Sequence, residues 1–193
     1  SGVRRYAATV LRRTAPAGKR GRPRARREVF SVDAVVLATG FEPYDPSVDG
    51  PFGYGRVPNV ITGLDAERQL AETQTLRRPS DGAAPKRVAF VQCVGSRTEE
   101  VERRPEETGY CSAVCCAYAL RMARQMRRRL PGVELTVFHM DIQNFGKGFD
   151  SFFAACREGM AFIRSRPCEV VPGPNGAVRV RYAPESDPKG QPV

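Results

Sequence analysis

The sequence predicts an α/β protein whose second half is a Rossmann-like βαβ unit. Three consecutive patterns carry this prediction: a β-branched and apolar run over Lys86–Val94, a helical pattern over Ser112–Leu130 that ends at Pro-Gly, and a second apolar run over Val133–Asp141. A strand, a helix and a strand of these lengths form a right-handed crossover, which places the two strands in one parallel sheet.

The order of elements continues in the same way beyond this unit. Residues Gly148–Gly159 predict a second helix, and Ala161–Val171 and Ala177–Ala183 predict two strands that the turn "PGPNG" joins. The polar tail 184–193 is expected to be disordered, because it offers too little apolar surface to bury.

The first half contains two further strand patterns. They cover Val3–Arg13 and Glu28–Gly40, and the second ends in the nearly unbroken apolar run "AVVLATG". Such a run is typical of a strand that is buried on both faces of a parallel or mixed sheet. The Gly/Pro/Arg-rich stretch between them has no periodicity and is interpreted as an exposed loop, and the Pro and Gly density over Phe41–Asn59 again argues against regular structure.

A short helix and a linker close this first half. The helix is expected over Ile61–Thr73 with Leu64 and Leu70 facing inward, and Leu76–Pro85 is interpreted as the linker. We therefore expect four segments: residues 1–75, the linker 76–85, a domain over 86–183 and the tail 184–193.

Composition restricts the class of protein. The chain has 193 residues, is 41% hydrophobic and contains six cysteines and one histidine. It has no apolar run of about 18 residues, which a membrane-spanning helix would need. The basic N-terminus lacks the apolar core of a signal peptide. We expect a cytoplasmic protein in which clustered cysteines bind metal or take part in redox chemistry, since disulfides serve mainly small secreted domains. The first residue is Ser rather than Met, which suggests part of a longer protein.

The net charge of +10 is concentrated in two arginine-rich stretches. One of them, Lys19–Arg27, contains Arg-Gly-Arg-Pro, the core of an AT-hook that enters the A·T minor groove of DNA. A nucleic-acid-binding protein is therefore one alternative function. The match is short, so we favour a solvated loop and do not expect nucleic acid as a partner.

A cysteine-rich loop stands where a dinucleotide-binding unit would carry its glycine motif. Of G-x-G-x-x-G only Gly95 remains, and the loop is flanked by Cys93 upstream and by Cys111, Cys115 and Cys116 downstream. Asp141 ends the second strand roughly where a ribose-binding acid would lie, but without the glycines we interpret it as a polar residue at a strand end.

The expected helix gives these cysteines a shared chemistry. If Ser112 caps the helix, Cys115 and Cys116 lie in its first turn, where backbone N–H groups and the helix dipole favour thiolates. Cys93 leaves its strand at the same edge of the sheet. Four converging thiolates suit an iron–sulfur cluster or a structural zinc ion. The spacing C-x17-C-x3-C-C contains no C-x2-C pair and fits neither standard template, so both alternatives remain open.

The remaining candidate residues have ordinary structural interpretations. Cys156 and Cys168 are expected in the core, because free cysteine behaves as a small hydrophobe. His139 is expected to be a strand residue. Lys147 stands between two glycines in "FGKGFD", where it could contact an anionic cofactor group or simply precede a helix.

Several motifs together resemble one protein family. "VVLATGFEPYDP", "FGYGRVPNVITGLDAERQL", "PKRVAFVQCVGSR", "YCSAVCCAYALR" and "HMDIQNFGKGFDSFF" are similar in order to the A subunit of heterodisulfide reductase and to the related flavoprotein of quinone-interacting oxidoreductases. The resemblance runs from about Val32 to Arg164.

The resemblance implies a flavin and iron–sulfur electron-transfer subunit with a thioredoxin-reductase-like core, in which residues 1–75 end an FAD-binding domain. It implies that Cys93, Cys111, Cys115 and Cys116 bind a [4Fe–4S] cluster. It also places Thr39 and Gly40 of "ATG" beside FAD, with Arg121 and Lys147 as further cofactor-binding residues.

The sequence also departs from this family. The glycine motif of the FAD domain is absent from these 193 residues, so we expect a partial chain or a second chain that supplies the rest of the FAD site. Arg121 stands where family members usually carry Lys; it keeps the charge but cannot release a proton. Other heterodisulfide-reductase-like subunits are the expected partners, and a structural zinc module remains the second alternative function.

Overall fold

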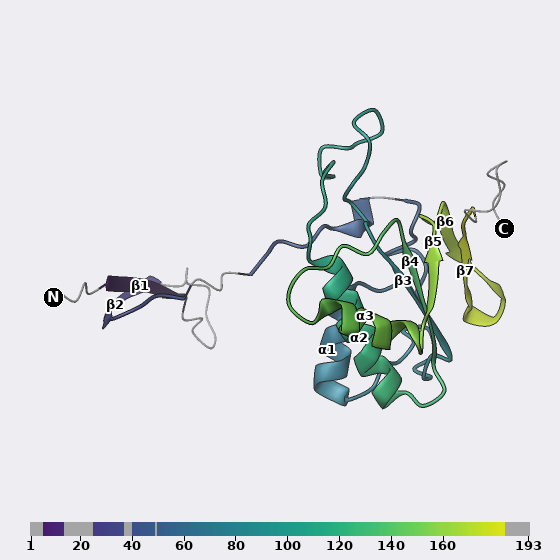
Figure 1. Ribbon diagram of the computed structural model, residues 1–193, viewed down its shortest axis with the longest axis horizontal. Coiled ribbons are helices and arrows are strands. Elements are labelled where there is room, and N and C mark those ends of the chain that lie inside the picture. The colour runs from purple at the N-terminus through teal and green to yellow at the C-terminus, as the bar shows by residue number, and fades with distance from the viewer. Residues whose placement is uncertain (1–5, 14–24, 37–39, 49, 184–193) are drawn as a thin grey trace, which may run out of the picture. The chain divides into compact units, whose positions relative to one another are not determined.

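The computed structural model describes residues 6–13, 25–36, 40–48 and 50–183 (Figure 1). These residues belong to two compact units, Ser1–Pro43 and Tyr44–Val193, which we describe separately. Most of the arginine-rich segment 19–27 and the whole tail 184–193 lie outside the described residues.

The first unit contains an antiparallel pair of strands, β1 (Tyr6–Arg13) and β2 (Ala25–Val32), with Tyr6 opposite Val32. The prediction of a buried strand that runs through residues 33–36 is wrong. No strand follows Val32 among the described residues of this unit, and the side chain of Val36 is 89% exposed. An apolar strand needs cover on both faces, which a sheet of two strands cannot supply.

The second unit is built on a parallel sheet of three strands. Its strands are β3 (Arg87–Val91), β4 (Glu134–His139) and β5 (Ala161–Arg164), hydrogen-bonded in this order. Helices α2 (Cys115–Arg129) and α3 (Phe149–Arg157) make the two crossovers that parallel strands require. The predicted βαβ unit is therefore confirmed, and a third strand extends it.

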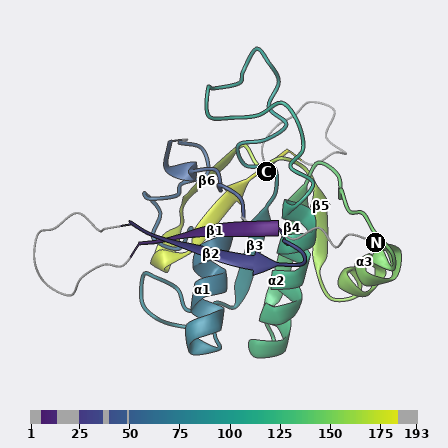
Figure 2. The same ribbon diagram turned by 90° about the vertical axis from the view of Figure 1, so that its left-hand side faces the viewer.

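The register of the sheet aligns apolar side chains in rows across it. Phe90 is opposite Val137, and Val137 is opposite Phe162. This row belongs to the hydrophobic core, to which α2 contributes Leu120 and Met126, both almost fully buried. The three helices lie on one side of the sheet (Figures 1 and 2).

Helix α1 (Gly63–Thr73) begins at a capping box in which Thr62 and Asp65 bond each other's backbone N–H groups. Leu70 is buried as predicted, whereas Leu64 is 37% exposed, so the prediction that it faces inward is wrong. Successive helical residues are about 100° apart, which places Ala66 rather than Leu64 on the face that carries Leu70.

The segment 76–85 does not separate two packed bodies. Leu76 is buried in the same core as Leu70 and Leu120, and the division between compact units falls after Pro43. The assignment of residues 1–75 to the end of an FAD-binding domain stays a prediction.

The strand predicted over residues 161–171 is divided into β5 and β6 (Glu169–Pro172). Strand β6 pairs antiparallel with β7 (Val178–Arg181). This hairpin lies across the sheet from the helices, and the ring of Tyr182 meets that of Phe138 with 5.0 Å between centroids (Figure 1).

Candidate functional site: the cysteine loop at the sheet edge

The long loop between β3 and α2 is closed at its base. An isolated bridge pairs Ser96 with Thr108, and the Thr108 N–H donates to the Gly95 carbonyl over 3.0 Å. The intervening residues 99–106 are exposed and project from the rest of the unit (Figure 1). Because its base is closed, the loop returns Cys111 to the edge of the sheet where Cys93 leaves β3.

The turn that carries Cys93 depends on left-handed backbone conformations. Cys93, Gly95 and Arg97 have φ values of 62°, 72° and 59°, and the Ser96 N–H donates to the Cys93 carbonyl. A Cβ atom on Gly95 would lie 2.4 Å from the ring of Tyr44. Only glycine combines this φ with so close a neighbour at low cost.

Helix α2 begins at Cys115, so Cys115 and Cys116 occupy its first turn as predicted. The prediction that Ser112 caps the helix is wrong: Val114 is the N-cap residue and makes no side-chain capping bond. The Ser112 side chain instead hydrogen-bonds Cys115. The physical reason is the backbone of Ala113, whose φ of 57° is left-handed and prevents the right-handed helix from beginning directly after Ser112.

The protonation of the two adjacent cysteines is strongly unequal. The pKa of Cys115 is lowered to about 6, first by a hydrogen bond from the Cys116 thiol, and then by the N–H of Cys93 and by Ser112 against the opposing effect of burial. The pKa of Cys116 is raised, because its thiol donates to Cys115 and is buried. The contacts therefore favour a thiolate on Cys115 and a protonated thiol on Cys116.

Donors also surround the other sulfur atoms. The Ala113 N–H donates to Cys111 Sγ over 3.3 Å, and a Gln143 backbone bond favours the thiolate of Cys116. The pKa of Cys93 is raised, chiefly by burial and then by the nearby charge of Cys115. Backbone donors directed at sulfur are a known feature of iron–sulfur sites, where they help to set the potential.

Cys93 connects the other three cysteines, since it interacts with Cys111, Cys115 and Cys116, and Cys115 and Cys116 interact with each other. Within the described part of the chain, no three His, Cys, Asp or Glu side chains are already arranged to hold a metal ion. The Cys116–Cys115 hydrogen bond gives one reason, because it turns one thiol toward the other. The donor set of four thiols with N–H partners fits an iron–sulfur cluster once these thiols have lost their protons.

The structure adds an ion pair that the sequence did not reveal. Arg97 binds Asp141, which lies two residues beyond the end of β4, and Gln143 Nε2 donates to the other carboxylate oxygen of Asp141 over 2.8 Å. Arg97 also interacts with Cys93 and Cys111. The only sequence signal was an arginine four residues after Cys93, and its partner is 44 positions away.

The predicted cofactor-binding residues are not brought together into one described site. Thr39 lies outside the described residues, and Gly40, with φ of 78°, belongs to the first unit. Arg121 pairs with Glu67 of α1 over 2.7 Å and lies over the ring of Tyr118. Lys147 is exposed between two glycines. Their roles toward FAD stay predictions.

The two separate cysteines differ in their surroundings. Cys156 is fully buried in the core, as predicted. Cys168 is exposed, so the prediction that it lies in the core is wrong. It immediately precedes β6, where its N–H bonds the Arg181 carbonyl while its side chain faces solvent. His139 ends β4 and packs edge-on against Phe162, which confirms its place in a strand.

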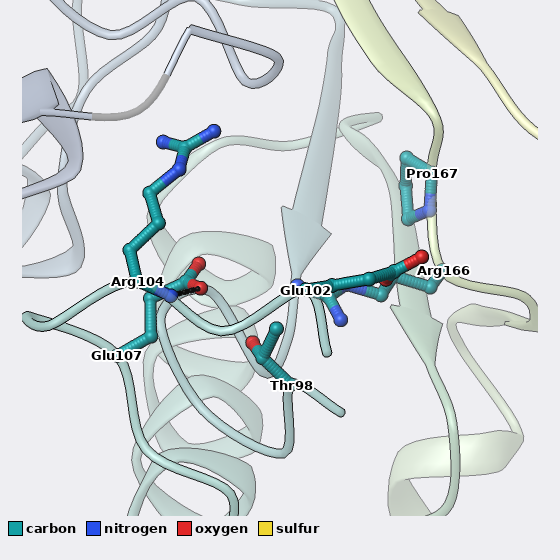
Figure 3. Close-up of a pocket in the computed structure, with 6 residues that line it drawn as sticks. All are labelled: Thr98, Glu102, Arg104, Glu107, Arg166 and Pro167. Atoms are coloured by element: carbon teal, nitrogen blue, oxygen red, sulfur yellow. Dashed lines mark hydrogen bonds between the residues drawn. The ribbon is translucent and has the colours of Figure 1, made fainter. Parts of the chain in front are cut away.

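A polar pocket opens beside the exposed loop (Figure 3). Carboxylates and guanidinium groups alternate around it, so it selects neither anions nor cations. It is lined by Thr98, Glu102, Arg104, Glu107, Arg166 and Pro167.

No helix among the described residues is long and apolar enough to cross a membrane. Taken together, the fold and the site define a class: an α/β domain that carries a cysteine-containing loop at the edge of a three-stranded parallel sheet.

The sequence of this chain is similar to those of several known proteins of one family. The chain is 44% identical over 158 residues to the A subunit of the H(2):CoB-CoM heterodisulfide,ferredoxin reductase of Methanothermobacter marburgensis, a match that covers 79% of this chain and 23% of the relative. It is 41% identical over 150 residues to the second of two iron–sulfur A subunits of the CoB–CoM heterodisulfide reductase of Methanopyrus kandleri, covering 74% and 22%. It is 35% identical over 158 residues to the A subunit of the ferredoxin:CoB-CoM heterodisulfide reductase of Methanosarcina mazei, covering 79% and 19%. No family model matches the chain.

Over this shared stretch, the chain belongs to the family of heterodisulfide reductase A subunits, whose members are oxidoreductase subunits. The chain spans only about a quarter or less of the length of these relatives.

Proposed function

We propose that this chain forms part of an electron-transfer subunit of a heterodisulfide-reductase-like complex, in which Cys93, Cys111, Cys115 and Cys116 bind a [4Fe–4S] cluster. One observation carries the proposal: Cys93 interacts with Cys111, Cys115 and Cys116 at one edge of the sheet, where N–H and O–H groups are directed at sulfur. When bound, such a cluster supplies one-electron transfer without acid–base chemistry by the protein.

The roles of the chain's own residues follow from their contacts. The first turn of α2 presents Cys115 and Cys116 at the positive end of the helix dipole, which favours an anionic centre. Ser112 and the N–H of Cys93 stabilise the Cys115 thiolate before any metal arrives. Tyr44 packs on Gly95 and fixes the turn that carries Cys93.

We extend the proposal to FAD as the second cofactor and to other heterodisulfide-reductase-like subunits as partners. The names of the relatives support a redox complex of several subunits. Gly40, Arg121 and Lys147 are the residues of the described chain that we propose to contact FAD. A thioredoxin-reductase-like core and a cytoplasmic location remain predictions of the same kind.

The first test measures iron, acid-labile sulfide and zinc per chain, together with the visible spectrum, after anaerobic purification and reconstitution. We expect about four iron and four sulfide per chain, as a [4Fe–4S] cluster requires. Cys115→Ala should lose both, whereas the exposed Cys168→Ala serves as the matched control and should retain them. One zinc ion per chain in a colourless protein would replace this proposal with a structural zinc module.

A further inference from the structure

The Arg97–Asp141 ion pair joins the two loops that form the cysteine site. Arg97 lies in the turn that follows β3 and carries Cys93, and Asp141 lies directly beyond the end of β4. The carbonyl of Asp141 is 4.0 Å from Cys116 Sγ, so this residue contacts the site through its backbone while its carboxylate holds Arg97. Gln143 fixes the second carboxylate oxygen.

The position of Arg97 is determined by more than this pair. Its φ of 59° lies in the left-handed region, and the exposed loop begins two residues further on, at residue 99. Its side chain is 25% exposed, so its charge is screened less than that of a freely solvated arginine. The guanidinium interacts with the sulfur atoms of Cys93 and Cys111, two of the four predicted ligands.

We propose that Arg97 is a positioning residue that stabilises the reduced state of the centre bound by the four cysteines, and that Asp141 holds it there and partly opposes its charge. This inference rests on the proposed [4Fe–4S] site. A bound cluster gains one negative charge when an external reductant supplies one electron, so a nearby cation favours the reduced form and a nearby anion disfavours it.

Neutralising the two partners separately should therefore shift the potential in opposite directions. Arg97→Gln should lower the fraction reduced at a fixed potential about tenfold, which corresponds to about 59 mV for a one-electron couple. Asp141→Asn leaves Arg97 in place without its counter-charge and should raise the midpoint. Arg97→Lys retains the charge and should lie between Arg97→Gln and the wild type.

The experiment is a redox titration of the anaerobically reconstituted 193-residue chain, followed by electron paramagnetic resonance, with iron and sulfide measured on each sample. Arg181→Gln is the matched control, because it breaks an arginine–carboxylate pair, with Glu169, on the β6–β7 hairpin. Opposite shifts for Arg97→Gln and Asp141→Asn, with iron retained and the control unchanged, would support the inference. A purely structural pair would not produce shifts of opposite sign.

The other outcomes are decisive as well. Variants that bind the full amount of iron and sulfide but have the same midpoint potential as the control would overturn the role of Arg97 and leave the cluster proposal intact. A wild-type chain that loads no iron and sulfide would overturn both. If Arg97→Gln binds little iron and sulfide, the midpoint potential of Asp141→Asn is the measurement that tests the inference. If neither loads although circular dichroism shows both folded, the pair is structural and the role in setting the potential is refuted.

Discussion

Substituting Gly95 by alanine tests the geometry of the cysteine site most directly, because two separate costs fall on this position. Gly95 has φ of 72°, and adding a Cβ atom in the left-handed region costs about 1–2 kcal/mol. Alanine also restricts the unfolded chain more than glycine does, which favours the folded state by about 0.4–1 kcal/mol. The net destabilisation from the backbone is therefore about 1 kcal/mol. The new Cβ would also lie 2.4 Å from the Tyr44 ring, which must then move.

Displacing a packed side chain in this way typically costs about 1–3 kcal/mol. We therefore expect Gly95→Ala to lower the free energy of unfolding by about 2–4 kcal/mol in total. Gly132→Ala is the matched control, since Gly132 has φ of 79° and no atom within 4 Å of its would-be Cβ. It should cost only the backbone contribution of about 1 kcal/mol.

Urea unfolding of the reduced chain, followed by circular dichroism, measures these differences. In a Tyr44→Ala background, Gly95→Ala should cost no more than Gly132→Ala does, because the overlap is removed. Equal costs for Gly95→Ala and Gly132→Ala in the wild-type background would show that Tyr44 does not cover the turn. The described packing of the cysteine loop would then be wrong.

Three further predictions follow from burial and charge. In the metal-free chain, the rate of Cys115 alkylation by iodoacetamide should rise through a pH of about 6, because the thiolate forms above its lowered pKa, and unfolding in urea should move this rise to near pH 9. Cys156→Ser should destabilise the fold by about 1–3 kcal/mol, because it buries a hydroxyl in the core, whereas Cys168→Ser on the surface should change stability by less than about 0.5 kcal/mol in urea unfolding. Leu70→Ala should cost about 2–5 kcal/mol, and the half-exposed Leu64→Ala should cost far less by the same measurement.

The sequence predicted the parts of the fold that local patterns determine. The order of strand, helix and strand from β3 to β4 follows from apolar runs and from the Pro-Gly stop after α2, both of which act over a few residues. The predictions from sequence are wrong where the structure of a segment depends on which other elements pack against it. The run beyond Val32 is as apolar as a buried strand, but the described unit offers it no covering layer. The division of the predicted strand at 165–168 likewise depends on which neighbour each half can pair with.

The same distinction applies to the site. Clustering in the sequence was enough to place Cys115 and Cys116 at the first turn of a helix. Ser112 was assigned to the helix cap from its residue type, which does not reveal the left-handed backbone of Ala113 that delays the start of the helix to Cys115. Arg97 was missed because its partner Asp141 becomes a neighbour only when β3 and β4 lie side by side in the sheet.

The adjacent cysteines also explain why no C-x2-C pair is needed. Neighbouring helical residues point about 100° apart, which would separate two ligands directed at one small ion. Here the N-terminus of α2 lies between the ends of two strands, and each cysteine faces a different one. Cys115 accepts the N–H of Cys93 beyond β3, whereas Cys116 contacts the backbone of Asp141 and Gln143 beyond β4. Because the Cys116 thiol also donates to Cys115, the two sulfur atoms still face one common site between the loops, which suits either a four-iron cluster or a single zinc ion.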